Sequence, residues 1–298
     1  MASTQDLKRR VRSISNTRKL TRAMELVASA RLRRAQLRIE AMRPYADRMI
    51  ELMAGTAQAG GAASLPLLQR RDEVKAVAIV AVTGDRGLAG AFNAQVLRRC
   101  FAELREAQAR GEEAKFFAAG KRGESTIRFR RLELAKSWSG FSDKPTYADA
   151  QMIARTVADA FVTGEVDRVI VVYNAFVSPL VQRVTVSELL PVPTELLAAE
   201  EAAPSQSEKT PPIDFFFEPE PRQILERLLP VYVETELYRA LLESAASEQG
   251  ARMTAMRNAS KAAGELIDSL TLAMNRARQA EITQEILEVV AGADALSG

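Results

Sequence analysis

The C-terminal stretch from Arg222 to about Val290 repeats apolar and small residues every seven positions. The repeat forms two rows, which are Met253, Ser260, Ile267 and Met274 on one side and Met256, Ala263, Leu270 and Ala277 on the other. This spacing is typical of a helix that winds around another helix. Such a helix would be roughly 100 Å long, and its stripe is thin because much of it is Ala, Ser or Met. We therefore expect it to pair with a second helix and to contact an outside partner, or water, along most of its length.

A second heptad pattern covers residues 1–55 and predicts the partner helix. One row contains Leu7, Ile14, Thr21, Ala28, Ala35, Met42 and Met49, and a companion row contains Val11, Leu32, Ile39, Ala46 and Met53, with Arg18 and Glu25 as interruptions. Ser3 and Asp6 have the spacing of a capping box at the start of this helix, and Pro44 should bend or split it. The two terminal helices are expected to form a long antiparallel coiled coil.

Between these helices the pattern changes to alternating strands and helices. Glycines and a proline mark residues 54–73 as a linker. The predicted strands are Val74–Val82, Ala114–Ala118, Glu133–Trp138 and Arg168–Val177, and the predicted helices are Ala91–Gln108, Lys121–Arg128 and Tyr147–Val162. Val181–Leu189 alternates polar and apolar residues as an antiparallel edge strand does, and Ile213–Phe217 could close the sheet. This succession predicts a doubly wound, Rossmann-like α/β domain over residues 74–218, inserted between the two coiled-coil helices.

The second coiled-coil helix is expected over residues 222–298. The proline-rich and acidic segment 191–212 is interpreted as a loop before it, Glu218–Pro221 should start the helix, and Pro230 should kink or restart it. Apolar residues gather again near the end of the chain, namely Ile282, Ile286, Val289 and Val290. Such an apolar end is typical of a docking site, although it could also fold back on the α/β domain.

The composition argues against an enzyme. The chain has no histidine and a single cysteine, Cys100, so the commonest general base is absent and neither a disulfide nor a thiolate metal cluster is expected. We expect no catalytic residues, no cofactor and no metal ligands. No run reaches 18 apolar residues, which argues against a membrane span.

Three glycines, Gly84, Gly87 and Gly90, lie between a predicted strand and a predicted helix, where nucleotide-binding loops occur. The dinucleotide fingerprint is G-x-G-x-x-G, whereas the spacing here is G-x-x-G-x-x-G. A tight turn from strand to helix is therefore favoured over a nucleotide site. A cofactor-dependent α/β enzyme is the weaker alternative.

Positive charge is concentrated at the N-terminal end. Residues 1–50 contain 13 Lys and Arg against 4 Asp and Glu, although the whole chain has a net charge of only +3. This segment could be a solvated helix face, or a targeting presequence, although the heptad row that continues from Leu7 argues against cleavage. A basic coiled coil that binds nucleic acid is the sharper alternative, and a protein partner lined with carboxylates fits equally well.

Three stretches together resemble the gamma subunit of F-type ATP synthase, namely Lys8–Ala28, Thr83–Asn93 and Ala277–Ala293. The resemblance extends over the whole chain and is weakest across residues 191–214. It implies a non-catalytic rotor of the central stalk, whose paired helices stand inside a ring of three alpha and three beta subunits. The α/β domain would contact the epsilon subunit and the membrane-embedded c-ring, and rotation would couple proton transport to ATP synthesis or hydrolysis. The resemblance also implies a peripheral membrane protein on the cytoplasmic face of a bacterial plasma membrane, with no nucleic acid among its partners.

The same resemblance assigns partner contacts to individual positions. Met24 lies in the segment that passes acidic loops of the beta subunits. The positions expected to bond to loops of the alpha and beta ring are Arg252, Arg278, Gln279, Thr283 and Glu285. Phe215 and Glu218 are expected at the c-ring, where Phe215 replaces a tyrosine common in the family and would lose a hydroxyl contact.

Overall fold

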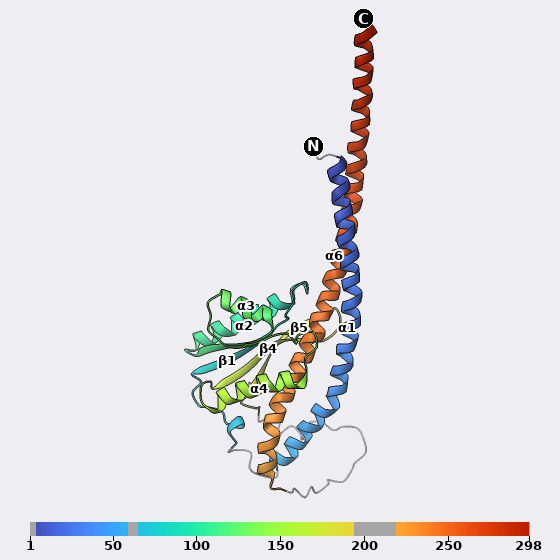
Figure 1. The fold of residues 1–298 in the computed structure, drawn as a ribbon. Coiled ribbons are helices and arrows are strands. Elements are labelled where there is room, and N and C mark those ends of the chain that lie inside the picture. Colours follow the sequence, from blue (N-terminus) through green and yellow to red (C-terminus); the bar gives the residue numbers. More distant parts are fainter. Residues whose placement is uncertain (1–3, 59–64, 194–218, 298) are drawn as a thin grey trace. The chain divides into compact units, whose positions relative to one another are not determined.

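The computed structural model describes residues 4–58, 65–193 and 219–297 (Figure 1). Two very long helices, α1 (Thr4–Gln58) and α6 (Pro221–Ser297), begin and end the described chain. Within the described residues, the part between them consists of five strands, three α-helices and one short 3-10 helix. The predicted fold class, an α/β domain inserted between long terminal helices that pack together, is confirmed.

The chain forms two compact units, and both α1 and α6 contribute to each of them. The coiled-coil unit consists of Met1–Ser29 and Arg252–Gly298, and the α/β unit consists of Ala30–Ala251. None of the helices in the described part of the chain is at once long enough and apolar enough to cross a membrane.

The α/β unit is built on a five-stranded sheet with the order β3-β2-β1-β4-β5. The strands are β1 (Ala76–Val82), β2 (Glu113–Ala119), β3 (Leu134–Trp138), β4 (Arg168–Phe176) and β5 (Gln182–Leu190). The first four strands are parallel, and β5 pairs with β4 in the antiparallel direction at one edge, as predicted. Every residue of β1 is buried, because this central strand is covered on both faces and is apolar throughout.

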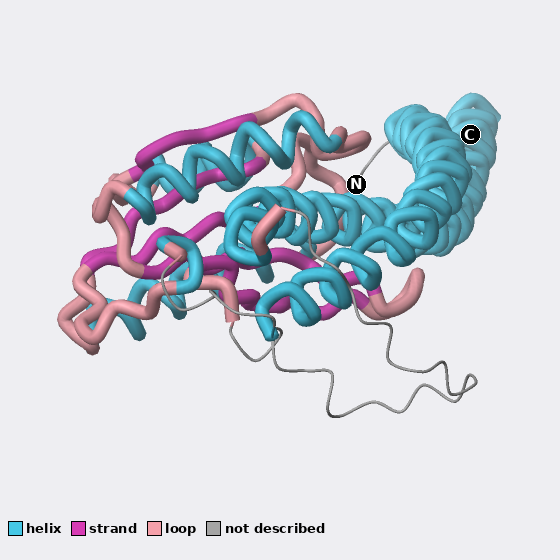
Figure 2. The backbone as a smooth tube through the Cα atoms, turned by 90° about the horizontal axis from the view of Figure 1, so that it is seen from below, coloured by secondary structure: helices cyan, strands magenta, loops and turns pink. Residues whose placement is uncertain are grey.

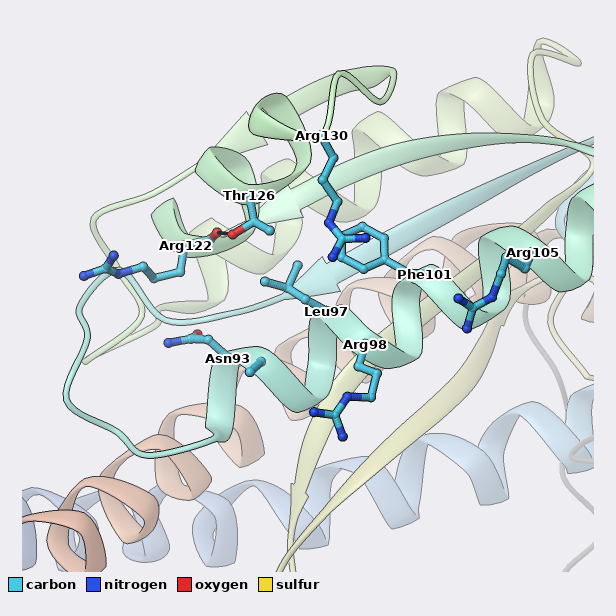
Figure 3. Close-up of a pocket in the computed structure, with 9 residues that line it drawn as sticks. Asn93, Leu97, Arg98, Phe101, Arg105, Arg122, Thr126 and Arg130 are labelled. Carbon is cyan, nitrogen blue, oxygen red and sulfur yellow. Dashed lines mark hydrogen bonds between the residues drawn. The ribbon is translucent and has the colours of Figure 1, made fainter.

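Helices cover both faces of this sheet. Helices α2 (Phe92–Ala109) and α3 (Lys121–Phe129) pack on one face of the sheet, against Ile79 and the other residues of β1 that point to the same side. Helix α4 (Tyr147–Val162) and α6 pack with Val80 and its neighbours on the other. Figure 2 shows the strands in magenta with helices on both sides, and Figure 3 shows side chains of α2 facing α3. The alternation of β1 residues between two separate cores follows from the period of two in a strand.

Helix α4 has the bounds that the sequence predicted, and a local signal explains where it begins. The Thr146 hydroxyl accepts a hydrogen bond from the Asp149 N–H at 3.3 Å, and the Asp149 carboxylate accepts one from the Thr146 N–H at 2.8 Å. This reciprocal capping box fixes the first turn. Apart from Ile213–Phe217, the other predicted strands and helices of the sheet domain are present, with ends that differ by at most two residues.

The prediction that Pro44 could split α1 and that Pro230 could restart α6 is wrong. Both α1 and α6 continue as α-helix through Pro44 and Pro230. Both prolines are exposed, so the carbonyl group that each deprives of a hydrogen-bond donor faces solvent and can bind water instead. Pro221 is the first residue of α6, a position where the missing N–H costs nothing.

The predicted linker over residues 54–73 contains more structure than expected. Helix α1 extends to Gln58, and Pro66–Leu68 forms a 3-10 helix. Leu65 and Leu68 are buried in the core that α4 and α6 share. The proposed cap at Ser3 and the proposed strand Ile213–Phe217 lie outside the described residues.

In the coiled-coil unit α1 and α6 run antiparallel. Thr4 donates a hydrogen bond to Glu281, and farther along α1 Glu25 accepts one from Arg257. On α6, every residue of the two predicted heptad rows from Met253 to Ala277 is buried or half-buried, whereas residues 278–293 are all exposed. The heptad spacing therefore identified the contact face of α6 correctly.

Candidate functional site

The α6 segment Ser244–Gly250, here called the joint segment, is buried at every position within the α/β unit. A Cβ atom on Gly250 would lie 3.1 Å from the carbonyl oxygen of Pro179, between β4 and β5. A Cβ atom on Gly84 would lie 2.8 Å from the carboxylate of Glu248 in the joint segment. Both distances are shorter than ordinary van der Waals contact, so α6 packs closely against two loops of the α/β unit at these glycines.

The carboxylate of Asp143 connects the joint segment to two other parts of the α/β unit. Its Oδ1 atom accepts a hydrogen bond of 2.9 Å from Gln249 Nε2 of α6. Its Oδ2 atom accepts one of 2.6 Å from Arg31 Nη1 of α1 and lies 3.3 Å from Arg86 Nη1 of the glycine-rich turn. Hydrogen bonds from guanidinium to carboxylate are among the stronger ones. A single side chain therefore holds both long helices against the loops that follow β1 and β3.

A second group of contacts fixes α6 against α4. The buried carboxylate of Glu234 accepts hydrogen bonds from the Tyr147 hydroxyl at 2.7 Å, from Gln151 Nε2 at 3.0 Å and from Arg155 Nε at 3.3 Å. Burial, together with the hydrogen bond to Glu234, raises the pKa of Tyr147 to about 12. The phenol therefore stays protonated and keeps donating at neutral pH. Because Glu234 precedes the joint segment on the same helix, α6 is held at two places along its length.

The crevice at the carboxyl end of β1 is filled by the protein itself. This is the topological switch point between β1 and β4, where doubly wound sheets bind ligands. On the side of β4, Asn174 Nδ2 donates to the Phe92 carbonyl oxygen at 3.3 Å, and the Asn174 carbonyl oxygen accepts from the Ser247 hydroxyl of α6 at 3.0 Å. On the side of β2 and β3, the Asp85 carboxylate accepts hydrogen bonds from three backbone N–H groups of the following loops, at 2.9 to 3.1 Å. The remaining cavity beside Glu248 is about 10 Å³, which is the space of one water molecule at most. The glycine-rich turn therefore serves packing, as the spacing of its glycines indicated.

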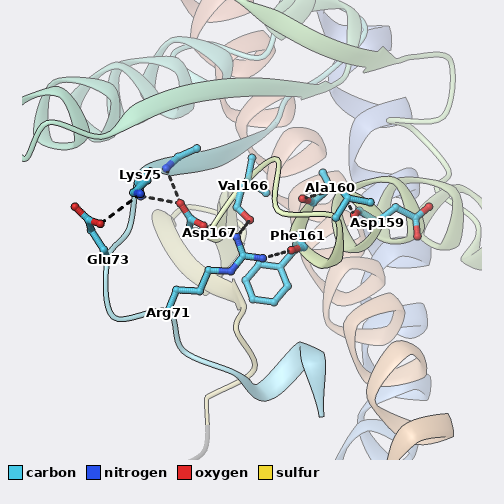
Figure 4. Close-up of polar contacts among 10 residues, drawn as sticks. Arg71, Glu73, Lys75, Asp159, Ala160, Phe161, Val166 and Asp167 are labelled. Carbon is cyan, nitrogen blue, oxygen red and sulfur yellow. Dashed lines mark hydrogen bonds and ion pairs between the residues drawn. The ribbon is translucent and has the colours of Figure 1, made fainter. Parts of the chain in front are cut away.

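Arg71 stabilises the opposite end of the strands, where β1 and β4 begin (Figure 4). Arg71 forms an ion pair with Asp167 and donates to the carbonyl oxygens of Phe161 at 2.7 Å and Val166 at 3.4 Å. Asp167 also accepts from the N–H groups at the start of β1, at 2.7 and 2.9 Å. Burial opposes ionisation of Asp167, but the bonds from Arg71 and from the backbone outweigh it and hold the pKa of this carboxyl below its usual range. This cluster positions β1 and stabilises the fold.

One buried charge lies in the seam of the coiled-coil unit. Glu25 is 6% exposed and accepts hydrogen bonds from Arg257 Nε at 2.9 Å and from Arg22 Nη1 at 2.8 Å. The hydrogen bond from Arg257 is the main reason that the pKa of Glu25 is lowered, with Arg22 adding to it against the effect of burial. The interruption that Glu25 makes in the heptad row is thus an ion pair between the two helices.

Comparison with known proteins covers the chain from end to end. The family model described as ATP synthase matches residues 3–296. The ATP synthase gamma chain of Rubrobacter xylanophilus is 48% identical over 297 residues, which are 100% of this chain and 99% of that one. The gamma chain of Desulforamulus reducens is 45% identical over 99% of this chain and 100% of its own length. The chain belongs to the ATP synthase gamma chain family. The gamma chain is a non-catalytic subunit of ATP synthase and the rotor of its central stalk.

Solved structures agree with this assignment. A chain from the central stalk and c-ring of the Tetrahymena thermophila mitochondrial ATP synthase is 26% identical, with a TM-score of 0.58, and the match covers 81% of this gamma chain and 99% of that chain. A chain of the Euglena gracilis mitochondrial ATP synthase is 16% identical and matches 98% of this gamma chain and 94% of its own length, with a TM-score of 0.67. The second likeness supports the fold alone.

The structure places the predicted partner-binding residues of this gamma chain at several locations. Met24 is 42% exposed on α1 of the coiled-coil unit. Arg252 is half-buried at the start of the α6 part of that unit. The exposed residues near the end of α6 are Arg278, Gln279, Thr283 and Glu285. The Thr283 hydroxyl donates to the Gln279 carbonyl oxygen of the same helix at 2.8 Å. Phe215 and Glu218, predicted at the c-ring, lie outside the described residues.

Sequence reasoning missed the residues that fix the gamma chain helices to the α/β unit. Asp143 lies in a loop with no distinctive spacing, and its partners are more than 50 residues away in the chain. Glu248 and Gln249 did give a signal, because they bring polar side chains into a helix whose other faces are small and apolar. That signal indicates burial against loops, but it does not identify which loops.

Proposed function

We propose that this gamma chain transmits torque between a membrane-embedded c-ring and a catalytic ring of alpha and beta subunits, and so couples proton transport to ATP synthesis or hydrolysis. The joint segment Ser244–Gly250 is the observation that carries this proposal. It is enclosed by loops and tied through Gln249 and Asp143 to Arg31 of α1. A force applied to the α/β unit would therefore be passed to both long helices.

The continuity of the helices supports the next step of this transmission. Both α1 and α6 continue as α-helix across the boundary between the units, at residues 29–30 and 251–252. We assign residues 1–55 and 222–298 to the two coiled-coil helices, of which the parts in the coiled-coil unit, residues 1–29 and 252–298, would stand inside the ring. Residues 74–218 then form the domain that contacts the epsilon subunit and the c-ring. Phe215 and Glu218 remain the predicted c-ring residues.

Exposed side chains of the coiled-coil unit support the contact with the catalytic ring. Apolar side chains are exposed at the end of α6 in the isolated chain. The exposed fraction is 57% for Ile286 and 72% for Val289. They suit an apolar collar in a partner. Basic residues such as Lys19 and Arg22 precede Met24 on α1 and would attract acidic loops of beta subunits over several ångströms without interlocking with them. In this proposal Met24, Arg252, Arg278, Gln279, Thr283 and Glu285 contact the ring.

The location follows from the assembly in this proposal. The relatives described above include gamma chains of two bacteria, Rubrobacter xylanophilus and Desulforamulus reducens. A chain bound to a c-ring, without a spanning helix in its described part, would be a peripheral protein of the membrane. We assign it to the cytoplasmic face of a bacterial plasma membrane.

The test is a native pull-down through an affinity tag on this chain. We expect nucleotide-binding alpha and beta subunits to co-purify at three copies each for one copy of the gamma chain, together with epsilon and the c-ring. Recovery of the chain without ring subunits would contradict the proposal. Recovery with nucleic acid that is released by salt would instead support the basic coiled coil that binds nucleic acid.

A further inference from the structure

A cavity of about 500 Å³ lies between α2 and α3, on the face of the sheet opposite to α4 (Figure 3). The buried side chains of Leu97 and Phe101, both on α2, form an apolar part of its lining. The volume falls within the range of sites that bind small molecules. The cavity is separate from the filled crevice at the carboxyl end of β1.

Four arginines line this cavity, which we call the arginine pocket. Arg98 and Arg105 come from α2, Arg122 from α3, and Arg130 from the residue after α3. Figure 3 shows Arg122 and Arg105 toward opposite ends of the group, with Arg98 and Arg130 between them. The Arg130 guanidinium lies 4.1 Å from the centroid of the Phe101 ring. No acidic residue is among the nine that line the pocket.

The charges of the pocket arginines are not compensated by ion pairs within the described residues. Other arginines of the same two helices are compensated, since Arg99 pairs with Glu103 and Arg128 pairs with Glu124. Uncompensated like charges around a concave surface repel one another and create a positive potential that attracts anions. An anion in the pocket would relieve this repulsion.

We propose that the arginine pocket binds a small anion with two or more linked phosphate groups, such as a nucleoside diphosphate. The planar guanidinium fork matches the oxygens of phosphate and can donate two parallel hydrogen bonds. Arg98 and Arg105 are seven residues apart on α2, which is about 10 Å along the helix axis. The four arginines are also spread along the pocket (Figure 3), so a chain of linked phosphates can contact more of them than a single phosphate can.

The apolar lining favours a ligand with an organic part. Ala94 and Leu97 have no group that could bind phosphate, but they offer contact area to a base or a sugar. This inference goes beyond the proposed rotor function and does not depend on it. Substitution of a pocket arginine should leave the pull-down of ring subunits unchanged, so failure of one proposal can be distinguished from failure of the other.

Isothermal titration calorimetry on the full chain tests the proposal, with inorganic pyrophosphate, ADP and adenosine as probes. We expect saturable binding of one pyrophosphate or ADP per chain at low ionic strength, and none of adenosine. Arg122→Gln should raise the Kd of pyrophosphate about tenfold. Arg128→Gln is the matched control, because it removes the same charge from the same helix outside the pocket, and it should change the Kd less than about twofold.

The outcomes separate the sources of the phosphate and the ways in which the proposal could fail. Tighter binding of ADP than of pyrophosphate would place a nucleoside against the apolar lining, and equal binding would indicate a free polyphosphate. The proposal is overturned if neither probe binds at millimolar concentration, or if Arg122→Gln and Arg128→Gln weaken binding equally. It is also overturned if a poly-glutamate peptide binds the pocket and pyrophosphate does not, because the pocket would then be a docking surface for a protein.

Discussion

Asp143, Asp167 and Glu25 each join segments that are far apart in the sequence, and their burial differs. The side chain of Asp143 is 28% exposed, whereas those of Asp167 and Glu25 are 10% and 7% exposed. Water competes more strongly for the hydrogen bonds of Asp143. Each of these hydrogen bonds therefore contributes less to stability than one made by the buried carboxylates of Asp167 and Glu25. Asp143 matters because it connects three separate parts of the α/β unit, namely α1, α6 and the glycine-rich turn.

Asp143→Ala should loosen the joint segment more than it destabilises the whole unit. We expect the free energy of unfolding of the α/β unit to fall by about 1–2 kcal/mol, because Gln249 and Arg31 lose an acceptor. Amide hydrogen exchange of residues 244–250 should accelerate. Asp72→Ala changes an exposed carboxylate and serves as the control. Unchanged exchange in the joint segment would show that packing alone holds α6 there.

Asp167→Asn should lower stability at neutral pH but have little effect in acid. The folded pKa of Asp167 is depressed below its ordinary value of 3.8, so its ionised form stabilises the fold above that value. The contribution is lost as the pH falls through the folded pKa. We expect a loss of about 2–3 kcal/mol at pH 7, measured by urea unfolding. The difference between wild type and variant should shrink below pH 4, and a difference that stays constant would contradict the role of this charge.

At the scale of elements, patterns that depend on neighbours in the chain were predictable. The heptad rows identified the contact face of α6 from Met253 to Ala277, and the start of α4 follows from a capping box that is complete within four residues. Contacts between residues that are far apart in the sequence were not predictable. Glu25 looked like an interruption because its partner Arg257 is 232 residues away. Pro44 does not split α1, because whether a proline breaks a helix depends on whether that side of the helix faces solvent.

The seam of the coiled-coil unit provides a prediction about how two helices are aligned. Glu25→Gln should weaken the pairing of α1 with α6 by about 1–2 kcal/mol, because the buried acceptor of two arginines loses its charge. The double change Glu25→Leu with Arg257→Leu should restore most of this stability, since no buried charge remains unpaired. Hydrogen exchange of residues 4–29 reports the change locally. If the double variant were weaker than Glu25→Gln, packing could not replace the ion pair.

At the scale of the whole molecule, the coiled-coil unit exposes large apolar side chains that a partner could cover. Leu20, Leu26 and Val27 are between 52% and 66% exposed on α1, in the same segment that holds much of the positive charge. A helix with exposed apolar and basic residues suits a partner that offers both an apolar wall and carboxylates. The sequence indicated such a partner, but its identity came from the family. Individual contacts such as that of Met24 remain predictions.

Met24→Lys should degrade coupling without unfolding the chain. The substitution adds a positive charge next to acidic loops of beta subunits in the proposed complex, so it should strengthen an attraction that rotation has to break in every step. We expect fewer protons to be transported per ATP hydrolysed in reconstituted vesicles. Met24→Leu keeps the size and lacks the charge, and it should behave like wild type. Equal coupling ratios for the lysine and leucine variants would contradict a contact that depends on charge.

Removal of every residue after Glu281 tests whether the end of α6 acts outside its own chain. Five of the apolar residues lost are each at least 45% exposed, and none belongs to a buried core of the α/β unit; they are Ile282, Ile286, Leu287, Val289 and Val290. The melting temperature of the α/β unit should therefore stay within about 2 °C of wild type, while assembly with ring subunits or the torque of the complex should fall. A full-length variant with serine at these five positions separates the apolar surface from helix length, because it keeps the backbone and loses only the apolar side chains. If the truncated chain lost its α/β fold, the end of α6 would be part of the core. If both variants assembled and turned normally, the ring would grip another part of the coiled-coil unit.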